Sequence, residues 1–244
     1  PERYRVSTEG NDLIMQGELA SGTDAAGPLY GARVRVILPQ NGDIVTSDSS
    51  LTITDATEAT ILISMATNYF GHQVPDQLSA LIAKAEGKSF DELKDDHIAA
   101  YYPKFNRVDL NLGESAASKL PINKRLTEFN KTKQDQDLMA LYFQFGRYLL
   151  ISSTREGLLP PNLQGLWCNT VRTPWNGDYH LNINLQMNLW PAEVTNLSEL
   201  HRPLIEWTKK QVPSGEQTAK VFYNSRGWVT HILGNLWEFT APGE

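Results

Sequence analysis

The chain has 244 residues, of which 41% are hydrophobic and 20% are charged, a composition typical of globular domains with a sizeable core. Its formal net charge is −6, so a basic surface that would hold nucleic acid or an anionic membrane is not expected. The single cysteine, Cys168, excludes an internal disulfide framework, and no His/Cys spacing indicates a metal or another cofactor.

Short β-type runs alternate with turn signals in residues 1–75. Val34 and Val36 alternate with arginines, and Asn41-Gly42 follows, which predicts a two-stranded hairpin over residues 33–46. Residues 51–53 and 61–65 predict two more strands, separated by a polar turn at 55–58. We therefore expect a piece of an antiparallel sheet with open edges that need partners.

Mixed elements follow in residues 76–129. Apolar residues at helical spacing predict a helix over 78–85 that stops at Gly87, and a second helix is expected to begin at the cap residue Ser89. Val108, Leu110 and Leu112 alternate as in a strand. This segment is interpreted as a mixed helical linker between two unlike domains.

Residues 130–244 are mainly helical in pattern. A helix of about 16 residues is predicted after Asp137, another from Asn196 or Ser198 despite Pro203 in its first turns, and a short one in GEQTAKVFYN. Residues 158–180 hold prolines, glycines and tryptophans without periodicity, which predicts a long loop. Helices joined by irregular loops favour an α-toroid or an α-bundle.

Several side chains of this region have two interpretations each. Trp167 and Trp175 either form apolar walls for a sugar or anchor the loop on the domain. Arg147 either binds a carboxylate or phosphate, or ties its helix to a neighbouring loop. His97 and His201 lie on predicted helices without a second histidine, which favours cap or surface positions over ligand positions.

The stretch YHLNINLQMNLW, residues 179–190, alternates amides with apolar side chains and holds no acid. Read as an extended segment, it places His180, Asn182 and Asn184 on one side and leucine and isoleucine on the other. The segment is then either a half-buried strand with its polar face in water, or one wall of a polar pocket.

The blocks FGRYLLISSTREGLLPPNLQGLW, HLNINLQMNLWPAEVTNLSELH and RGWVTHILGNLWEFTAP resemble glycoside hydrolase family 95, the inverting α-L-fucosidases and their α-L-galactosidase relatives. ATILISMATNY and HIAAYYPKFNRVDLNLG resemble upstream regions of the same family. The resemblance implies the end of an N-terminal β-sandwich (1–75), a helical linker (76–129) and the first part of an (α/α)6 catalytic barrel (130–244).

The resemblance also implies roles for single residues. It assigns Asn182 and Asn184 to holding the nucleophilic water, which suits amides because they both donate and accept hydrogen bonds. His180 matches a ligand of a sugar hydroxyl, and His231 lies in a matching block and is a candidate pocket residue. The implied substrate is an oligosaccharide outside the cell or in the periplasm, with no metal or cofactor.

One departure from the family pattern concerns the carboxylates. The family's general-acid glutamate and its partner aspartate lie well downstream of the His-x-Asn-x-Asn block, whereas this sequence ends at Glu244. We assign neither role to Glu244 nor to the nearby acids Asp178, Glu156 and Glu193. The sequence is therefore expected to be a central fragment that needs the remainder of the same polypeptide and is inactive alone.

Three other functions stay open. In a carbohydrate-binding module the amides and aromatic residues would bind sugar without cleaving it. In a phosphorylase-type enzyme, phosphate would replace water and need a basic pocket, yet the nearby Arg147, Arg155 and Arg172 form no obvious cluster. In a scaffold the amides would only stabilise the fold. L-Fucose and L-galactose differ by one hydroxyl on C6, which the sequence does not resolve.

Overall fold

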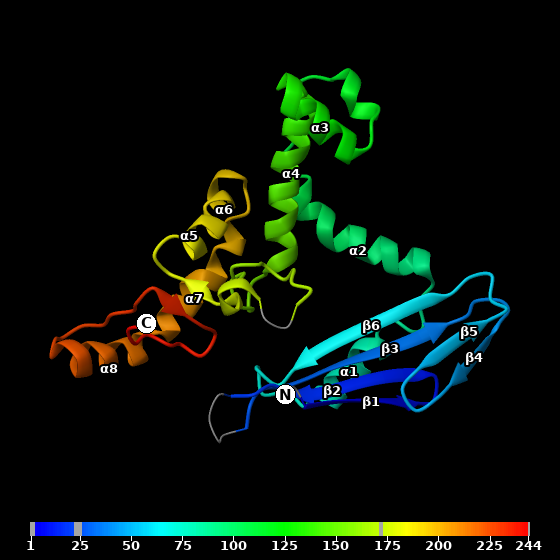
Figure 1. Cartoon of the computed structure of the whole chain (residues 1–244), viewed down its shortest axis with the longest axis horizontal. Coiled ribbons are helices and arrows are strands. Elements are labelled where there is room, and N and C mark those ends of the chain that lie inside the picture. The colour runs from blue at the N-terminus through cyan, green and yellow to red at the C-terminus, as the bar shows by residue number, and fades with distance from the viewer. Residues whose placement is uncertain (1–2, 22–25, 171–172, 244) are drawn as a thin grey trace. The chain divides into compact units, whose positions relative to one another are not determined.

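The computed structural model describes residues 3–21, 26–170 and 173–243. The chain divides into two compact units, Pro1–Ile98 and Ala99–Glu244, and helix α2 (Phe90–Phe105) crosses the division. Strands β1 to β6 all lie in the first unit, and most of the helices lie in the second, as the sequence predicted (Figure 1). In the described ranges no helix has the length and apolar character needed to cross a membrane.

A four-stranded antiparallel sheet forms the centre of the first unit, in the order β1-β2-β3-β6 (Figure 1). The strands are β1 (Arg3–Glu9), β2 (Asp12–Glu18), β3 (Leu29–Ile37) and β6 (Thr60–Thr67). Helix α1 (Val74–Ala83) covers one face, and it buries Val74, Leu78 and Ile82 at intervals of four residues.

The hairpin predicted over residues 33–46 is wrong. β3 pairs with β2 on one side and with β6 on the other, so Val34 faces both Leu13 and Ile63 and no edge of β3 remains for the next strand. β4 (Asp43–Thr46) pairs instead with β5 (Leu51–Thr54) in a separate two-stranded sheet. The strands predicted at 51–53 and 61–65 are confirmed as β5 and β6.

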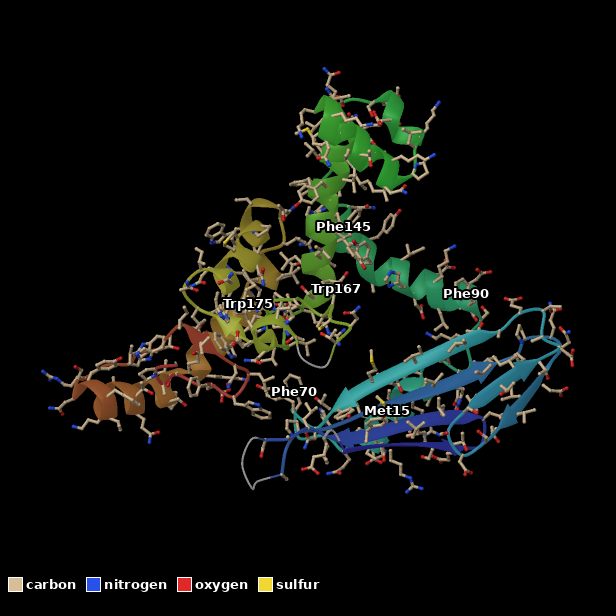
Figure 2. All side chains as sticks on the ribbon, in the orientation of Figure 1. Met15, Phe70, Phe90, Phe145, Trp167 and Trp175 are labelled. Atoms are coloured by element: carbon tan, nitrogen blue, oxygen red, sulfur yellow. The ribbon has the colours of Figure 1, made fainter. Side chains whose placement is uncertain are left out.

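The two faces of the sheet differ in polarity. The carboxylate of Asp12, which is 1% exposed, accepts hydrogen bonds from Arg33 and Arg35 on the face that α1 covers. On the other face the alternate β6 residues Ile61, Ile63 and Met65 are exposed, and the register continues this face through Val34 on β3 to Leu13 and Met15 on β2. Met15 is labelled in Figure 2. The sheet thus buries its ion pairs and exposes an apolar surface.

Helix α2 begins as predicted. The Ser89 hydroxyl accepts from the Glu92 amide at 3.3 Å, and the Glu92 carboxylate accepts from the Ser89 amide at 2.7 Å, which together form a capping box. The strand predicted at 108–112 is wrong. The carbonyl of Val108 accepts from the Gln144 side chain at 2.7 Å, so a side chain rather than a strand partner satisfies it.

The long helix predicted after Asp137 is confirmed as α4 (Gln136–Ser153), which follows η1 (Ala116–Lys119) and α3 (Ile122–Thr132). Asp135 caps α4 and also pairs with buried Arg125. Arg147 of α4 is 1% exposed and donates to the carbonyls of Phe105 at 2.6 Å and Lys104 at 2.9 Å. The second interpretation of Arg147 is therefore confirmed, because it ties its helix to a neighbouring segment.

Short helices complete the second unit. They are η2 (Pro174–Gly177), α5 (Asn184–Leu189), α6 (Pro191–Val194), η3 (Ser198–Leu200), α7 (Arg202–Lys210) and α8 (Val212–Tyr223), with β7 (Tyr179–His180) paired to β8 (Leu233–Gly234). The single helix predicted from residue 196 or 198 is wrong, since η3 ends first and α7 restarts with Pro203 near its beginning. The core contains Leu150, Tyr179, Leu185, Leu189, Ala192, Leu197, Leu200 and Trp207.

The buried charges of the sheet predict a pH-dependent stability. Burial alone would raise the pKa of Asp12, but hydrogen bonds from Arg35 and Arg33 outweigh burial and lower it. A lowered folded pKa means that the stabilisation is complete above the unfolded value of about 3.9 and is lost as the pH falls through the folded pKa. Asp12→Asn should lower the free energy of unfolding at pH 7 by about 3 kcal/mol, because it removes the buried carboxylate that both Arg33 and Arg35 bind.

Urea unfolding followed by circular dichroism at pH 7 and pH 3 measures this effect. The difference between wild type and Asp12→Asn should shrink at pH 3. Asp48→Asn is the matched control, since Asp48 is exposed in the same unit and should change stability little at either pH. An equal loss of stability for Asp12→Asn at both pH values would contradict the ion-pair explanation.

Candidate active site

A left-handed turn leads the chain into the candidate site. Within η2, Trp175, Asn176 and Gly177 have φ values of 49°, 58° and 61°. This region of backbone space is uncommon for residues other than glycine and strained for a bulky one. Gln164 holds the turn by donating to the carbonyl of Pro174 at 3.0 Å, and the backbone amide of Leu163 donates to the carbonyl of Asp178 at 3.3 Å.

Tyr179 anchors the strand that follows this turn. Its side chain is 5% exposed, its hydroxyl donates to the carbonyl of Pro160 at 2.9 Å, and its ring meets the Trp207 ring edge-on at 4.7 Å between centroids. Because side chains alternate along extended backbone, burying Tyr179 directs its two neighbours to the opposite side. There the Asp178 carboxylate and Nδ1 of His180 form a hydrogen bond of 2.5 Å.

The extended reading of residues 179–190 is wrong beyond His180. Residues 181–183 form a turn and α5 starts at Asn184. Leu185 and Leu189 are 2% and 3% exposed whereas Met187 is exposed, so burial recurs every four residues and not every two. A strict alternation of amides and apolar residues also contains this four-residue spacing, and packing against the core selects the helix.

The amides of this stretch divide into two pairs. Gln186 donates to the carbonyl of Leu181 at 2.6 Å and Asn188 donates to the carbonyl of Asn162 at 3.0 Å, so both hold local backbone. Asn182 and Asn184 are exposed, and neither side chain bonds to another described residue. These two amides remain available to a water or a ligand.

The two predicted tryptophans lie in different surroundings. Trp175 is 69% exposed, and its ring lies edge-on to the His180 imidazole at 6.4 Å between centroids. Trp167 lies 6.3 Å from the Tyr148 ring on α4. The structure thus brings Trp175 together with His180, while Trp167 belongs to the surroundings of α4.

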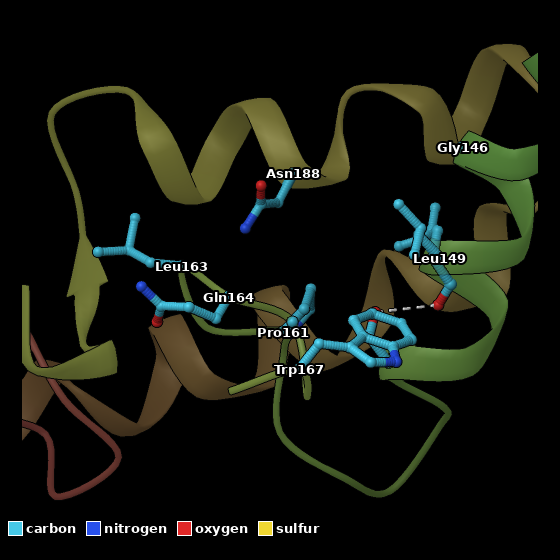
Figure 3. A pocket seen from close by; sticks show the side chains of 10 residues that line it. Gly146, Leu149, Pro161, Leu163, Gln164, Trp167 and Asn188 are labelled. Atoms are coloured by element: carbon cyan, nitrogen blue, oxygen red, sulfur yellow. Dashed lines mark hydrogen bonds between the residues drawn. The ribbon is translucent and has the colours of Figure 1, made fainter. Parts of the chain in front are cut away.

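A cavity of about 270 Å³ lies beside Trp167. Its wall includes Gly146, Leu149 and Ser153 of α4, loop residues Pro161 and Gln164, and Asn188 of α5. Figure 3 shows the Asn188 side chain projecting from α5 toward the loop side chains Gln164, Pro161 and Trp167. None of His180, Asn182 and Asn184 lines this cavity, so the candidate site is a surface beside it.

His231 is held by other residues of the chain. Its Nδ1 lies 2.7 Å from the carbonyl of Thr240, and its Nε2 lies 2.5 Å from the hydroxyl of Tyr223. Both ring nitrogens of His231 are therefore engaged, whereas in His180 only Nδ1 bonds to another described residue. The pocket role of His231 stays a prediction and requires that one of these bonds be exchanged for a ligand.

The carboxylates near the amides have partners. Glu156 accepts from Arg202 at 2.7 Å, and hydrogen bonds from Ser198 and His201 lower the pKa of Glu193. Across the described ranges no group of three or more His, Cys, Asp or Glu side chains is placed to hold a metal ion. Arg172 and Glu244 lie outside the described residues.

Sequence reasoning missed the contact of Asp178 with His180. The signal was available in the Asp-x-His spacing, because residues two apart share a side of any extended segment.

Comparison with known proteins places the chain among glycosidases. Residues 89–244 match the model of the glycosyl hydrolase family 95 catalytic domain, and residues 2–72 match that of the glycosyl hydrolase family 65 N-terminal domain. The chain is 35% identical to "Probable alpha-fucosidase A" of Aspergillus niger, over 97% of this chain and 32% of that protein. It is 34% identical to "Alpha-L-fucosidase 2" of Arabidopsis thaliana, over 88% of this chain and 27% of that protein. The chain thus spans about a third of the length of these relatives.

The left-handed turn predicts a specific effect of adding one methyl group. At Gly177 a Cβ atom would lie 3.0 Å from the Thr173 hydroxyl and 3.3 Å from Oε1 of Gln164, in addition to the strain of a positive φ. Gly177→Ala should therefore lower the free energy of unfolding by about 1–2 kcal/mol.

Gly157→Ala is the matched control for this measurement. Gly157 has φ +81°, but a Cβ atom there would have nothing within 4 Å, so this variant measures backbone strain alone. Thermal and urea unfolding should show the larger loss for Gly177→Ala. A loss no larger than that of Gly157→Ala would mean that the turn relaxes around the new methyl group.

Proposed function

Because the chain belongs to glycosyl hydrolase family 95, we propose that the protein containing it removes terminal α-L-fucosyl or α-L-galactosyl residues from oligosaccharides. The observation that supports this most is that two exposed amides, Asn182 and Asn184, follow within four residues of His180, whose Nε2 has no partner among the described residues. The names of the relatives favour a fucoside over a galactoside.

The proposed reaction is hydrolysis with inversion at the anomeric carbon. Asn182 and Asn184 hold the attacking water, because an amide oxygen accepts a hydrogen bond from the water while an amide N–H donates one to a lone pair of the water. Two carboxyl groups roughly 6.5–9.5 Å apart complete such a mechanism, one to protonate the leaving oxygen and one to act as base. The amides lower the barrier by holding the water in the orientation for attack. The two carboxyl groups carry out the proton transfers.

The sugar is proposed to lie against Trp175 and His180. An exposed indole offers an apolar plane to the C–H face of a pyranose, and an imidazole nitrogen offers a hydrogen bond to a hydroxyl. Trp167 and His231 are proposed as further substrate contacts, Trp167 at the cavity beside α4.

We propose the domain plan of an N-terminal β-sandwich part (1–75), a helical linker (76–129) and the first part of an (α/α)6 barrel (130–244). Ile63 and Met65 on β6 and Tyr142 on α4 are exposed apolar side chains. Such surfaces support a plan in which other parts of a larger protein cover them. The proposed partner is the remainder of the same polypeptide. The proposed location, in the periplasm or outside the cell, follows from where oligosaccharide substrates of this kind are digested.

The amide pair provides the main test. In the full-length protein, Asn182→Ala and Asn184→Ala should each lower kcat/KM for an aryl α-L-fucoside by a hundredfold or more, about 2.7 kcal/mol of barrier, because the water loses its orientation. Asn123→Ala, an exposed amide on α3, is the matched control and should have wild-type kinetics. An aryl α-L-galactoside measured in parallel shows which sugar the site prefers.

The other outcomes of this test separate the alternative functions. Unchanged turnover in both amide variants would make residues 182 and 184 part of a scaffold. Sugar binding without turnover in wild type would indicate a carbohydrate-binding module. Turnover that requires added phosphate would indicate a phosphorylase.

The 244-residue chain alone is expected not to hydrolyse these glycosides. Asp178 and Glu193, the carboxylates nearest the amides in sequence, are both paired with other side chains, so the site described here has no free acid. Purified chain and full-length protein should be assayed at equal concentration, with circular dichroism to establish that the chain is folded. Measurable fucosidase turnover by the chain would refute this expectation.

A further inference from the structure

Asp178 pairs with His180. His180 is proposed to contact the sugar, whereas Asp178 has no proposed role so far. Both side chains are 16% exposed, and the carboxylate lies 2.5 Å from Nδ1. Tyr179, buried between them in sequence, prevents either neighbour from turning toward the core. The pair is therefore held in place by packing and not by a flexible surface contact.

The carboxylate determines which nitrogen of His180 carries the proton. A carboxylate only accepts hydrogen bonds, so Nδ1 carries the hydrogen that points to Asp178. In the neutral ring Nε2 then keeps its lone pair and is an acceptor. Among the described residues none bonds to Nε2 of His180, whereas both nitrogens of His231 are engaged.

The surroundings of Nε2 fit a sugar. Trp175, 69% exposed, meets the His180 ring edge-on, so an apolar plane adjoins a single hydrogen-bond acceptor. A pyranose presents C–H groups on one face and hydroxyl hydrogens at its rim, which matches this combination. The left-handed turn that positions Trp175 ends at Gly177, directly before Asp178.

We infer that Asp178 is a positioning residue of the sugar site, which fixes the Nδ1 proton of His180 so that Nε2 accepts a hydrogen bond from a hydroxyl of the terminal sugar. The part of this inference that concerns the bound sugar, the sugar half, rests on the proposed function. The part that concerns the Nδ1 proton of His180, the proton half, does not. Asp178 acts through His180 and takes no part in bond cleavage.

The experiment uses the full-length protein that carries this chain, with four variants: Asp178→Asn, His180→Ala, the double variant of both, and Glu193→Gln. Kinetics with an aryl α-L-fucoside and an aryl α-L-galactoside give kcat and KM for each. Glu193→Gln is the matched control, because Glu193 also pairs with Nδ1 of a histidine, His201, but on an exposed surface. Thermal unfolding establishes that each variant is folded.

The expected result is a loss in kcat/KM of tenfold or more for Asp178→Asn, by analogy with the partners that orient metal-binding histidines, whose loss typically costs 10- to 100-fold. The same substitution in the His180→Ala background should have no further effect. An equal loss in both backgrounds, or no loss in either, would overturn the inference, because a structural role of Asp178 does not depend on the imidazole.

A second measurement separates this inference from the proposed function. Nitrogen-15 spectra of histidine-labelled protein, with the His180 signals identified by their absence in His180→Ala, report which ring nitrogen is protonated. Protonated Nδ1 and free Nε2 in wild type, changed in Asp178→Asn, support the proton half; an unchanged tautomer overturns it. If wild type cleaves neither glycoside, the proposed function and the sugar half fail, while these spectra still decide whether Asp178 sets the tautomer.

Discussion

The burial of Tyr179 is the contact on which the candidate site depends. Its ring packs on Trp207 and its hydroxyl bonds to the carbonyl of Pro160, so the chain cannot rotate about this point without opening the core. Strand geometry then places Asp178 and His180 on the other side. The polar groups of the site lie on loops, but the packing of Tyr179 in the core makes their positions rigid.

The sequence predicted best the elements whose signals are local. The capping box of Ser89 and Glu92 acts within one helical turn and occurs as predicted, and the long helix predicted after Asp137 forms as α4. The hairpin at Asn41-Gly42 failed because β3 pairs on both edges with β2 and β6, a competition between distant segments that no local pattern records.

The candidate site shows the same limit on a smaller scale. Alternating amides and leucines fit a strand and a helix equally in sequence, and only contact of Leu185 and Leu189 with the core decides between them. The left-handed turn at Trp175 was not predictable, because tryptophan carries no preference for positive φ, and the turn forms with the help of the distant Gln164. The composition of residues 158–180 predicted a loop, whereas the course of its backbone depends on packing against the rest of the unit.

The roles proposed for these side chains predict how the activity depends on pH. Amides do not titrate, so in the proposed mechanism the hold of Asn182 and Asn184 on the water would not change with pH. The charge of Asp178 faces an imidazole proton and is not aimed at the amides by any described contact. If the proposed inverting mechanism holds, the acid and base limbs of the pH–rate profile report the two reacting carboxyl groups. Under this proposal, the orientation of the water and the transfer of the proton can each be altered by substitution without the other.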